Sequence, residues 1–419
     1  MAVETRSVTD ICREARCAAR TLARLDTATK DAALAAIAGA LEARSTEILD
    51  ANGRDMEAGR EAGRSEALLD RLALDEARVA GIAAGVRKIA ALGDPVGEVI
   101  DGWRLPNGLD VRKERVPLGV IAVVYEARPN VTIDAAALCL KSGNAIVLRG
   151  SSSAAHSNAV LAGIAADAAT SAGVPDGAIA LVAGGGREEL AELATQDGLV
   201  DLIIPRGGEG LKAALKDIAT VPVIYAASGN CHVYVDAVAD LAAAEAIAVN
   251  AKTQRPGVCN AAETLLVHAD VADDFLPRVS AALRAGGVEL RGDDRARAIV
   301  ADMEEASDSD WDTEFLALVM AVGVVDSVED AIEHVNRHGS GHSEAIVTGD
   351  TAAARAFTKG VDAACVYVNA STRFTDGNQF GMGAEIGNST QKLHARGPIA
   401  LRELCTSKYV VEGDGHIRH

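Results

Sequence analysis

The chain has 419 residues, of which 49% are hydrophobic and only 3% aromatic, and its formal net charge at pH 7 is −19. This length exceeds that of a typical single domain, so we expect two or more packed units with cores built from aliphatic side chains. A strongly acidic surface repels nucleic acid and anionic membranes, because proteins bind both largely through Lys and Arg. We therefore expect neither as a partner.

Seven cysteines are spread along the chain without any Cys-x-x-Cys pair. An odd number at this spacing fits neither a disulfide framework nor a zinc cluster. The amino-terminal residues contain no apolar signal-peptide core, and no uninterrupted apolar run reaches the length of a membrane span. These features predict a protein of the reducing cytoplasm that holds no metal.

The first hundred residues are predicted to be helical. Leu34, Ile37, Leu41 and Ile48 recur at steps of three, four and seven residues, the spacing of a single helix face. Asp26-Thr27 precedes them and supplies N-cap residue types. We expect one helix to carry this apolar face.

Two further features precede the first expected sheet. The Ala- and Leu-rich stretch from Leu68 to Leu92 is predicted to be helical and ends at Gly93-Asp94-Pro95. Trp103 to Val116 alternates apolar and charged residues around Asn107-Gly108, a strong hairpin-turn dipeptide. We expect this hairpin to serve oligomerisation.

From Val120 onward, short apolar runs alternate with segments of helical length. The predicted buried strands are Val120 to Tyr125, Ala145 to Leu148, Ile179 to Val182, Leu202 to Ile204, Val223 to Tyr225 and His232 to Val235. The predicted helices include Ile133 to Lys141, Ser157 to Ala172 and Leu241 to Lys252. Repeated β–α units of this kind imply a parallel, doubly wound sheet. A second α/β unit is expected to begin near the strand from Thr264 to His268.

The most informative segment runs from Asn250 to Thr264 and holds Cys259 after a Pro-Gly turn, between a predicted helix and a predicted strand. A side chain in such a loop can project into a cleft. The nearby cations Lys252 and Arg255 would lower the pKa of a thiol, which a nucleophilic cysteine requires. Taken by itself, however, a cysteine is more often a small buried apolar residue.

A strand followed by a polar turn is predicted from Val116 to Asn130. Asn130 can donate a side-chain N–H to an oxyanion there, while the backbone N–H of the nucleophile supplies the second donor. The alternative is an Asx turn or an N-cap for the following helix, and the local sequence alone favours that alternative.

Two strand-to-helix turns offer groups for a nucleotide. Arg149-Gly150-Ser151, followed by two more serines, supplies a cation, hydroxyls and backbone N–H groups, which suit a ribose with a 2′-phosphate at the carboxyl edge of a sheet. The turn within Asp201 to Gly210 contains closely spaced glycines that let the backbone approach a cofactor. A serine-rich capping loop and purely conformational glycines are the respective alternatives.

Two motifs resemble functional sites without being interpreted as such. Gly381 to Gly387 looks like a dinucleotide fingerprint, but it is one residue too long and no clear strand leads into it. Cys231-His232 resembles a catalytic dyad, but adjacent residues of a strand point to opposite faces of the sheet.

Together these segments resemble the aldehyde dehydrogenase superfamily and, within it, the gamma-glutamyl phosphate reductase family. The strongest blocks are VPLGVIAVVYEARPNVTIDAAALCLKSGNAIVLRG, NAKTQRPGVCNAAETLLVH and FTDGNQFGMGAEIGNSTQKLHARGPIAL, and the match runs through nearly the whole chain. The resemblance implies an α/β fold of two doubly wound parallel-sheet domains with a small β oligomerisation element. The implied boundaries are 1–96 and 117–252 for an NADPH-binding domain, 253–395 for a catalytic domain, and 97–116 with 396–413 for the oligomerisation hairpin and C-terminal strand.

The resemblance also implies a role for individual residues. Cys259 would be the nucleophile and Asn130 the oxyanion donor. The groups expected to bind the cofactor NADPH are Arg149, Gly150 and Ser151 at the adenosine ribose and its phosphate, Pro205, Arg206, Gly207 and Gly208 near the diphosphate or nicotinamide half, and Glu314 with Phe315 at the nicotinamide ribose. The candidates for holding the anionic substrate are Arg128, Arg255, Lys392, His394 and Arg396, each of which has a structural ion pair as its alternative.

The implied reaction is the NADPH-dependent reduction of L-glutamyl 5-phosphate to L-glutamate 5-semialdehyde and phosphate through a Cys259 thioester, the second step of proline biosynthesis from glutamate. Hydrolytic members of the superfamily carry a Glu before a Gly-Gly pair to activate water, whereas the corresponding stretch here, Ala227 to His232, has none. An enzyme that handles an acyl phosphate must exclude water, so this departure fits. The expected partners are the substrate, further copies of the chain in a homodimer or homotetramer, and glutamate 5-kinase through functional coupling.

Three other functions stay open. One is an acylating reductase that uses a coenzyme A thioester, which an assay for phosphate dependence would separate. A second is a non-catalytic cofactor-binding relative, which the presence of both Cys259 and Asn130 disfavours. The third is a thiol hydrolase, for which no His stands in a convincing partner motif.

Overall fold

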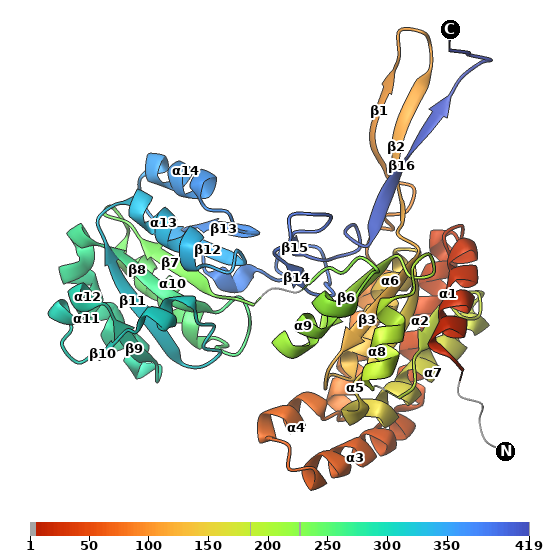
Figure 1. Ribbon diagram of the computed structural model, residues 1–419, viewed down its shortest axis with the longest axis horizontal. Helices are drawn as coiled ribbons and strands as arrows, with labels where there is room; N and C mark the ends of the chain where they lie inside the picture. Colours follow the sequence, from red (N-terminus) through yellow and green to blue (C-terminus); the bar gives the residue numbers. More distant parts are fainter. Residues whose placement is uncertain (1–5, 185, 226–227, 419) are drawn as a thin grey trace. The chain divides into compact units, whose positions relative to one another are not determined.

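The computed structural model describes residues 6–184, 186–225 and 228–418, and their α/β elements divide into two compact units (Figure 1). The first unit comprises residues 1–225, 382–387 and 399–419, and the second comprises residues 226–381 and 388–398. The predicted boundary after residue 252 is therefore wrong. The boundary lies earlier in the chain because of strand pairing. The strand β7 (Cys231–Val235) lies between β8 (Ala262–His268) and β12 (Ser343–Val347) in the sheet of the second unit.

The first unit begins with helices, as the sequence predicts. They are α1 (Val8–Leu22), α2 (Thr27–Ala43), α3 (Ser45–Glu61), α4 (Glu66–Leu72) and α5 (Glu76–Ala90). Asp26 caps α2 through the backbone N–H of Thr29, at 2.8 Å. Leu34, Ile37 and Leu41 line the buried face of α2, but Ile48 belongs to α3, because the helix is interrupted at Arg44. The expected single helix is thus two helices, and the four predicted apolar residues are all buried.

A parallel sheet with the strand order β5-β4-β3-β6 forms the centre of the first unit. Its strands are β3 (Val120–Tyr125), β4 (Ala145–Gly150), β5 (Ile179–Leu181) and β6 (Leu202–Arg206). The helices that follow these strands in turn are α6 (Asn130–Lys141), α7 (Ala155–Ser171), α8 (Arg187–Ala194) and α9 (Glu209–Ile218). A short 3-10 turn, η1 (Ser152–Ala154), precedes α7. Every residue of β3 and β4 is buried, which explains their uninterrupted apolar runs. The predicted strand Val223 to Tyr225 is wrong, because only a single bridge joins Val223 to Ile203.

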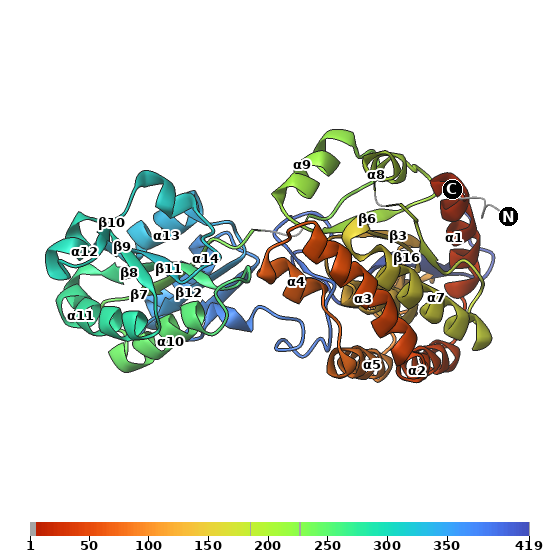
Figure 2. The same cartoon turned by 90° about the horizontal axis from the view of Figure 1, so that it is seen from below.

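Helices cover both faces of this sheet. The residues of α1, α8 and α9 pack with β3 and β4 in one apolar cluster, while α6 and α7 lie on the opposite face with α2, α3 and α5 behind them (Figure 2). The sheet is therefore doubly wound, as predicted. Ligands of such sheets bind beyond the carboxyl ends of the strands, near the point where the strand order reverses.

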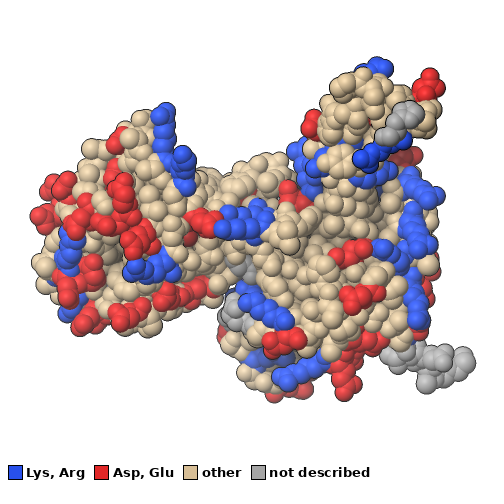
Figure 3. Space-filling view, turned by 45° about the horizontal axis from the view of Figure 1, so that its top comes forward, with Lys and Arg blue, Asp and Glu red and all other residues tan. Residues whose placement is uncertain are grey.

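The predicted hairpin is present and pairs with the C-terminal strand. β1 (Val99–Arg104) and β2 (Asp110–Pro117) are antiparallel, and β16 (Cys405–Glu412) pairs antiparallel with β2 (Figure 1). The turn at Asn107-Gly108 requires glycine at its second position, where φ is +95°. On the face shown in Figure 3, Lys and Arg side chains gather at the foot of this sheet, whereas acidic side chains predominate on the second unit.

The second unit contains a parallel sheet with the order β10-β9-β11-β8-β7-β12-β13. The strands not yet described are β9 (Glu289–Gly292), β10 (Glu304–Glu305), β11 (Val319–Val325) and β13 (Cys365–Val368). Its helices are α10 (Leu241–Thr253), α11 (Ala269–Ala285), α12 (Asp294–Ile299), α13 (Val328–His338) and α14 (Thr351–Gly360), with 3-10 turns η2 (Asp308–Asp312) and η3 (Thr372–Phe374). The short strands β14 (Asn388–Ser389) and β15 (Gly397–Pro398) form an antiparallel pair.

The two faces of this second sheet are covered by different helices. The residues of α10 and α11 share an apolar cluster with β8, β7 and β11, and those of α13 and α14 pack on the other face. No helix in the described part of the chain is long and apolar enough to cross a membrane.

Candidate functional site

Cys259 lies in the loop between α10 and β8, near the amino ends of β7 and β8. Its side chain is partly exposed. Its backbone carbonyl accepts a hydrogen bond from the thiol of Cys231 at 3.2 Å and lies so close to Gly229 that a β-carbon there would overlap it. The backbone of Cys259 is thus fixed by its contacts with Cys231 and Gly229, while its side chain is accessible.

The same loop is anchored to the segment after β13. The side-chain amide of Asn260 donates to the carbonyl oxygen of Thr375 at 2.9 Å, and the hydroxyl of Thr372 donates to the carbonyl oxygen of Asn260 at 2.7 Å. These bonds bring residue 373 over the loop that carries Cys259.

Arg373 was not singled out by the sequence, although it directly precedes the matching block that starts at Phe374. Its Nε donates to the side-chain oxygen of Gln254 at 2.8 Å. Burial and the charge of Arg255 lower the pKa of Arg373, while Cys259 is among the groups that raise it. The guanidinium of Arg373 therefore interacts electrostatically with both Arg255 and Cys259, and such a pair of like charges favours an anion beside them.

Lys252 does not have the role that the sequence predicts for it. Its ammonium is fully buried and paired with Glu263, which is also fully buried. Burial lowers the pKa of Lys252 and raises the pKa of Glu263 to about 7. Its charge is committed to Glu263, whereas the cation that interacts with Cys259 is Arg373.

The segment Glu314-Phe315-Leu316 is tied to the same region. The carboxylate of Glu314 accepts the backbone N–H of Gly229 at 2.7 Å, and Glu263 accepts the N–H of Leu316 at 3.3 Å. The ring of Phe315 lies 5.9 Å from the ammonium of Lys252 and 5.4 Å from the guanidinium carbon of Arg291. The segment that was predicted to contact the cofactor is therefore linked through Gly229 to the backbone of Cys259.

Lys392 and Arg396 both pair with Asp362, at 2.5 Å and 2.9 Å. These two cations lower the pKa of Asp362. His394 lies between them in the chain, in an exposed loop and with a φ of +69°. The structural ion pair, the alternative to substrate binding, is thus present for Lys392 and Arg396.

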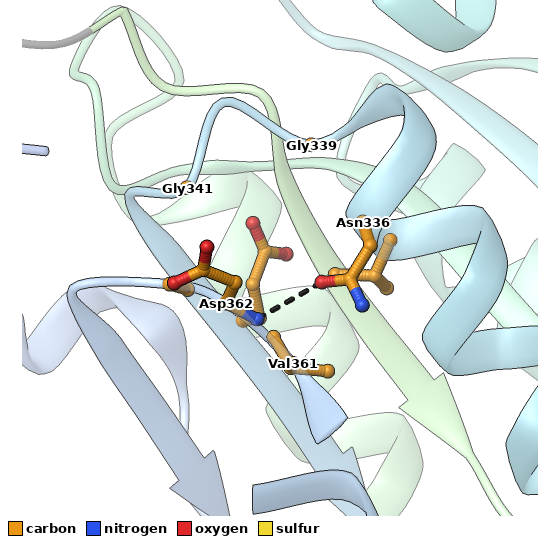
Figure 4. Close-up of a pocket in the computed structure, with 8 residues that line it drawn as sticks. Asn336, Gly339, Gly341, Val361 and Asp362 are labelled. Carbon is orange, nitrogen blue, oxygen red and sulfur yellow. Dashed lines mark hydrogen bonds between the residues drawn. The ribbon is translucent and has the colours of Figure 1, made fainter. Parts of the chain in front are cut away.

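Asp362 also lines a pocket of about 330 Å³ near the amino ends of β12 and β13 (Figure 4). Its backbone N–H donates to the side-chain oxygen of Asn336 at 2.9 Å, the bond drawn in the figure. Glu344 also lines this pocket, and burial raises its pKa well above the usual range. Neither Cys259 nor the other proposed catalytic residue, Asn130, lines this pocket.

In the first unit, Asn130 is the first residue of α6, after the short turn that follows β3. The N-cap position is held by Pro129, so Asn130 does not cap the helix. Its side-chain nitrogen donates to the carboxylate of Asp134, one turn further along α6, at 2.9 Å. The turn before it contains Ala127 with a φ of +40°, a left-handed conformation that is costly for a residue with a β-carbon.

Arg149 and Ser151 lie at the carboxyl end of β4, next to the end of β3. Arg149 is buried and donates to the carbonyl oxygen of Gly186 at 2.5 Å, and its burial lowers its pKa. The hydroxyl of Ser151 contacts that of Ser153 at 2.5 Å and makes no capping bond to the following helix. At Gly150 a β-carbon would overlap the side-chain amide of Asn158, so glycine is required there for close packing.

The turn from Pro205 to Gly208 lies at the carboxyl end of β6, which pairs with the other edge of β3. The backbone N–H of Gly208, at the start of α9, donates to the carboxylate of Glu126 at 3.0 Å. A negative group thus already occupies this helix end, where an anionic ligand group is favoured.

The predicted cofactor residues of the first unit therefore gather at one edge of its sheet, at the reversal of strand order between β3 and β6. The set of donors fits a phosphorylated dinucleotide, because it combines a buried guanidinium with adjacent hydroxyls. In the described residues, no cluster of His, Cys, Asp and Glu is arranged to hold a metal ion.

The two motifs that were set aside have structural roles. Gly381 to Gly387 contains no strand-to-helix turn, and a β-carbon at Gly383 would overlap Leu92. Cys231 bonds to the backbone of Cys259, whereas the ring of His232 contacts Glu344 at 3.0 Å, so the two side chains have separate partners. Of the stretch that lacks the hydrolytic Glu, Ala227 lies outside the described residues.

Comparison with known proteins supports a relationship over the full length. Residues 2–298 and 296–410 match the model of the aldehyde dehydrogenase family. The chain is 58% identical over 404 residues to a gamma-glutamyl phosphate reductase of Moorella thermoacetica, covering 96% of this chain and 97% of that protein. It is 56% identical over 406 residues to the enzyme of that name from Syntrophomonas wolfei, covering 97% of each.

A solved structure gives the same result. The crystal structure of gamma-glutamyl phosphate reductase from Thermotoga maritima matches with a TM-score of 0.97 and 46% identity, covering 99% of this chain and 100% of that chain.

Proposed function

Because the chain belongs to the aldehyde dehydrogenase family and, within it, to the gamma-glutamyl phosphate reductases, a group of oxidoreductases, we propose that it reduces L-glutamyl 5-phosphate to L-glutamate 5-semialdehyde and phosphate. The observation that carries this proposal is the setting of Cys259, whose side chain is accessible while its backbone is fixed and whose neighbours include two arginines. This product would serve the biosynthesis of proline.

Cys259 acts as the nucleophile. Its thiolate attacks the acyl carbon of the substrate, a carbon–sulfur bond forms, and the bond from that carbon to the phosphate oxygen breaks, which releases phosphate and leaves a thioester. NADPH, when bound, supplies the hydride that reduces the acyl group. The resulting thiohemiacetal then expels the thiolate and yields the aldehyde. Arg255 and Arg373 favour the thiolate over the neutral thiol because both are cations that interact near it.

The oxyanion that forms during attack accepts hydrogen bonds from the side-chain amide of Asn130 and the backbone N–H of Cys259. Hydrolysis of the thioester is disfavoured because the Glu with which hydrolytic relatives activate water is missing from the corresponding stretch. Residues 228–232, where hydrolytic relatives carry a Glu, contain none, and the nearby carboxylate of Glu314 is engaged by the N–H of Gly229.

Members of this family use NAD or NADP, and we propose NADPH as the cofactor. Arg149, Gly150 and Ser151 bind its adenosine ribose and 2′-phosphate, and the turn from Pro205 to Gly208 binds near its diphosphate. The nicotinamide ribose is bound by Glu314 and Phe315. The guanidinium of Arg149 is the feature that favours the 2′-phosphate over a free hydroxyl.

The anionic groups of the substrate are held by Arg255 and Arg373, with Arg128 and His394 as further exposed basic side chains. Lys392 and Arg396 act indirectly, because their pairing with Asp362 fixes the loop that carries His394. Arg373 is the residue that this proposal adds to those suggested by the sequence.

The three-stranded sheet is proposed as the surface for a second copy of the chain. Four large apolar side chains are exposed on it by between 44% and 61% of their surface, namely Val99, Trp103, Tyr409 and Val411. Exposed apolar patches of this kind are typical of protein–protein interfaces. A homodimer or homotetramer would cover it. We place the enzyme in the cytoplasm, where functional coupling to glutamate 5-kinase would supply its labile substrate.

The test is phosphate-dependent oxidation of L-glutamate 5-semialdehyde with NADP⁺, the reverse of the proposed reaction. Activity that requires phosphate supports the proposal, whereas activity only with coenzyme A would assign the chain to the acylating reductases instead. In parallel, an iodoacetamide-type alkylator is applied with and without substrate, and the labelled cysteine is mapped. Protection should be confined to Cys259, with the exposed Cys17 labelled equally in both samples.

A further inference from the structure

Asn130 and Asp134 occupy the same face of α6, four residues apart. The side-chain nitrogen of Asn130 donates to a carboxylate oxygen of Asp134 at 2.9 Å. Asp134 is only partly exposed, while the preceding turn holds Ala127 in a left-handed conformation. The geometry therefore commits one of the two N–H groups of the amide and leaves the other available.

An asparagine amide has two ends of nearly the same shape but opposite hydrogen-bonding character. A half turn about its terminal bond would place the oxygen where the nitrogen had been, and that oxygen would repel an oxyanion. An ionised carboxylate accepts hydrogen bonds and cannot donate, so it accepts only the nitrogen end. The bond to Asp134 thus selects one of the two orientations.

The charge of Asp134 is supported from a second strand. Burial raises its pKa to about 6, while the hydrogen bond from Asn130 and the charge of Arg206, at the end of β6, lower it. The carboxyl group is therefore ionised at neutral pH, the condition under which it fixes the amide.

We propose that Asp134 is a positioning residue that holds the amide of Asn130 with its N–H toward the oxyanion of the substrate. This inference rests on the proposed function, in which Asn130 is an oxyanion donor. Arg206 takes part because its charge favours the ionised form of Asp134. This role is separate from the cofactor binding proposed for Gly207 and Gly208.

The experiment compares the purified full-length variants D134L, D134N, N130A and N130A/D134L with the parent enzyme in the phosphate-dependent assay. D134L should lower kcat about 10- to 100-fold with little change in KM, because the oriented donor acts in the transition state. D134N should lie between the parent and D134L, since its side-chain oxygen can still accept the bond but its own N–H groups no longer exclude the reversed orientation of the Asn130 amide. D167N, at an exposed position on α7, is the matched control and should behave like the parent.

The double variant separates the possible failures. If Asp134 acts through Asn130, adding D134L to N130A should cause little further loss. An equal loss from D134L in both backgrounds, or a D134N variant as impaired as D134L, would overturn the positioning role. If N130A itself kept the kcat of the parent, the oxyanion role in the proposed function would fail instead. Thermal unfolding of each variant identifies any loss that comes from misfolding.

Discussion

Gly229 lies directly against the backbone carbonyl of Cys259, with no room between them for a single carbon atom. Gly229 is in turn held by the carboxylate of Glu314 through its N–H, at 2.7 Å. The position of the proposed nucleophile is therefore coupled to that of the segment proposed to contact the nicotinamide ribose.

Replacing Gly229 with alanine should displace Cys259 and reduce kcat at least 10-fold. The same change should lower the free energy of unfolding by about 1–3 kcal/mol, because the added carbon cannot be accommodated without backbone movement. Denaturant titration and steady-state kinetics measure the two effects. The control is G39A in the interior of α2, where a β-carbon meets open space and helix propensity predicts a gain of up to about 1 kcal/mol. Full activity in G229A would contradict the coupling.

Replacing Arg373 with glutamine should weaken both substrate binding and thiol activation. We expect kcat/KM to fall about 10- to 100-fold, as for the loss of a charged contact to an anion. The rate of alkylation of Cys259 should also shift to higher pH, because removing a neighbouring cation raises the pKa of a thiol. R355Q, at an exposed position of α14, should change neither quantity. An unshifted alkylation profile in R373Q would argue against thiolate stabilisation by this residue.

Breaking the buried pair of Lys252 and Glu263 should be strongly destabilising. K252M leaves the carboxyl group of Glu263 buried without its partner, so we expect a loss of about 3–5 kcal/mol in the free energy of unfolding. The double variant K252M/E263L should recover most of that loss, because no buried charge remains. R337A, which breaks an exposed pair with Glu333 on α13, should cost less than about 1 kcal/mol. These values are compared by chemical denaturation at a single pH.

The free energy of unfolding should depend on pH through Asp134. Its pKa is raised from 3.8 to about 6 in the folded protein, so the folded state binds this proton more tightly than the unfolded state. The contribution of Asp134 to stability is therefore greatest near pH 4, declines as the pH rises through 6, and is constant above about pH 7. Groups that face it include Asn130 and Arg206.

The D134N variant lacks this titration. Relative to the parent, it should become more stable as the pH rises from 4 to 7, with a difference of order 1–3 kcal/mol at the plateau. Denaturation curves at intervals across this range test the expectation. A difference that stays flat with pH would show that the raised pKa does not describe the folded protein.

Changing Trp103 and Tyr409 to serine should weaken self-association. Their rings contact each other edge to face with centroids 6.3 Å apart, and both are exposed on the three-stranded sheet. We expect the double variant to elute as a smaller species in size-exclusion chromatography with light scattering, at a concentration where the parent is oligomeric. V238S, which changes an exposed apolar residue of the second unit, is the control. An unchanged mass would place the interface elsewhere.

Local sequence patterns predicted most strands but not the sheet to which each belongs. The apolar run from Val120 to Tyr125 is found as β3, with the predicted bounds. The strand predicted from His232 to Val235 is also present, but it lies in the other sheet, because pairing depends on residues such as Ala262 and Glu344 that lie far along the chain. Hydrophobic periodicity carries no information about such partners.

The same limit applies to the candidate site. Cys259 and Asn130 stand in recognisable blocks, whereas Arg373 reaches Gln254 across 119 residues of sequence. Lys252 is seven residues from Cys259 in the chain, yet its side chain is buried against Glu263. Of the two cations that proximity in sequence suggested, Lys252 is thus paired elsewhere, and the proposed role of Arg373 could be inferred only from the fold.

The division of the chain into units also has a consequence for biosynthesis. The polypeptide passes from one unit to the other after residues 225, 381, 387 and 398, and its last strand, β16, pairs with β2 almost three hundred residues earlier. Contacts of such large sequence separation form slowly, since the intervening chain must first be ordered. On the ribosome, the edge of β2 must therefore remain unpaired until β16 has been synthesised, and chaperones that shield exposed strand edges would act during that interval.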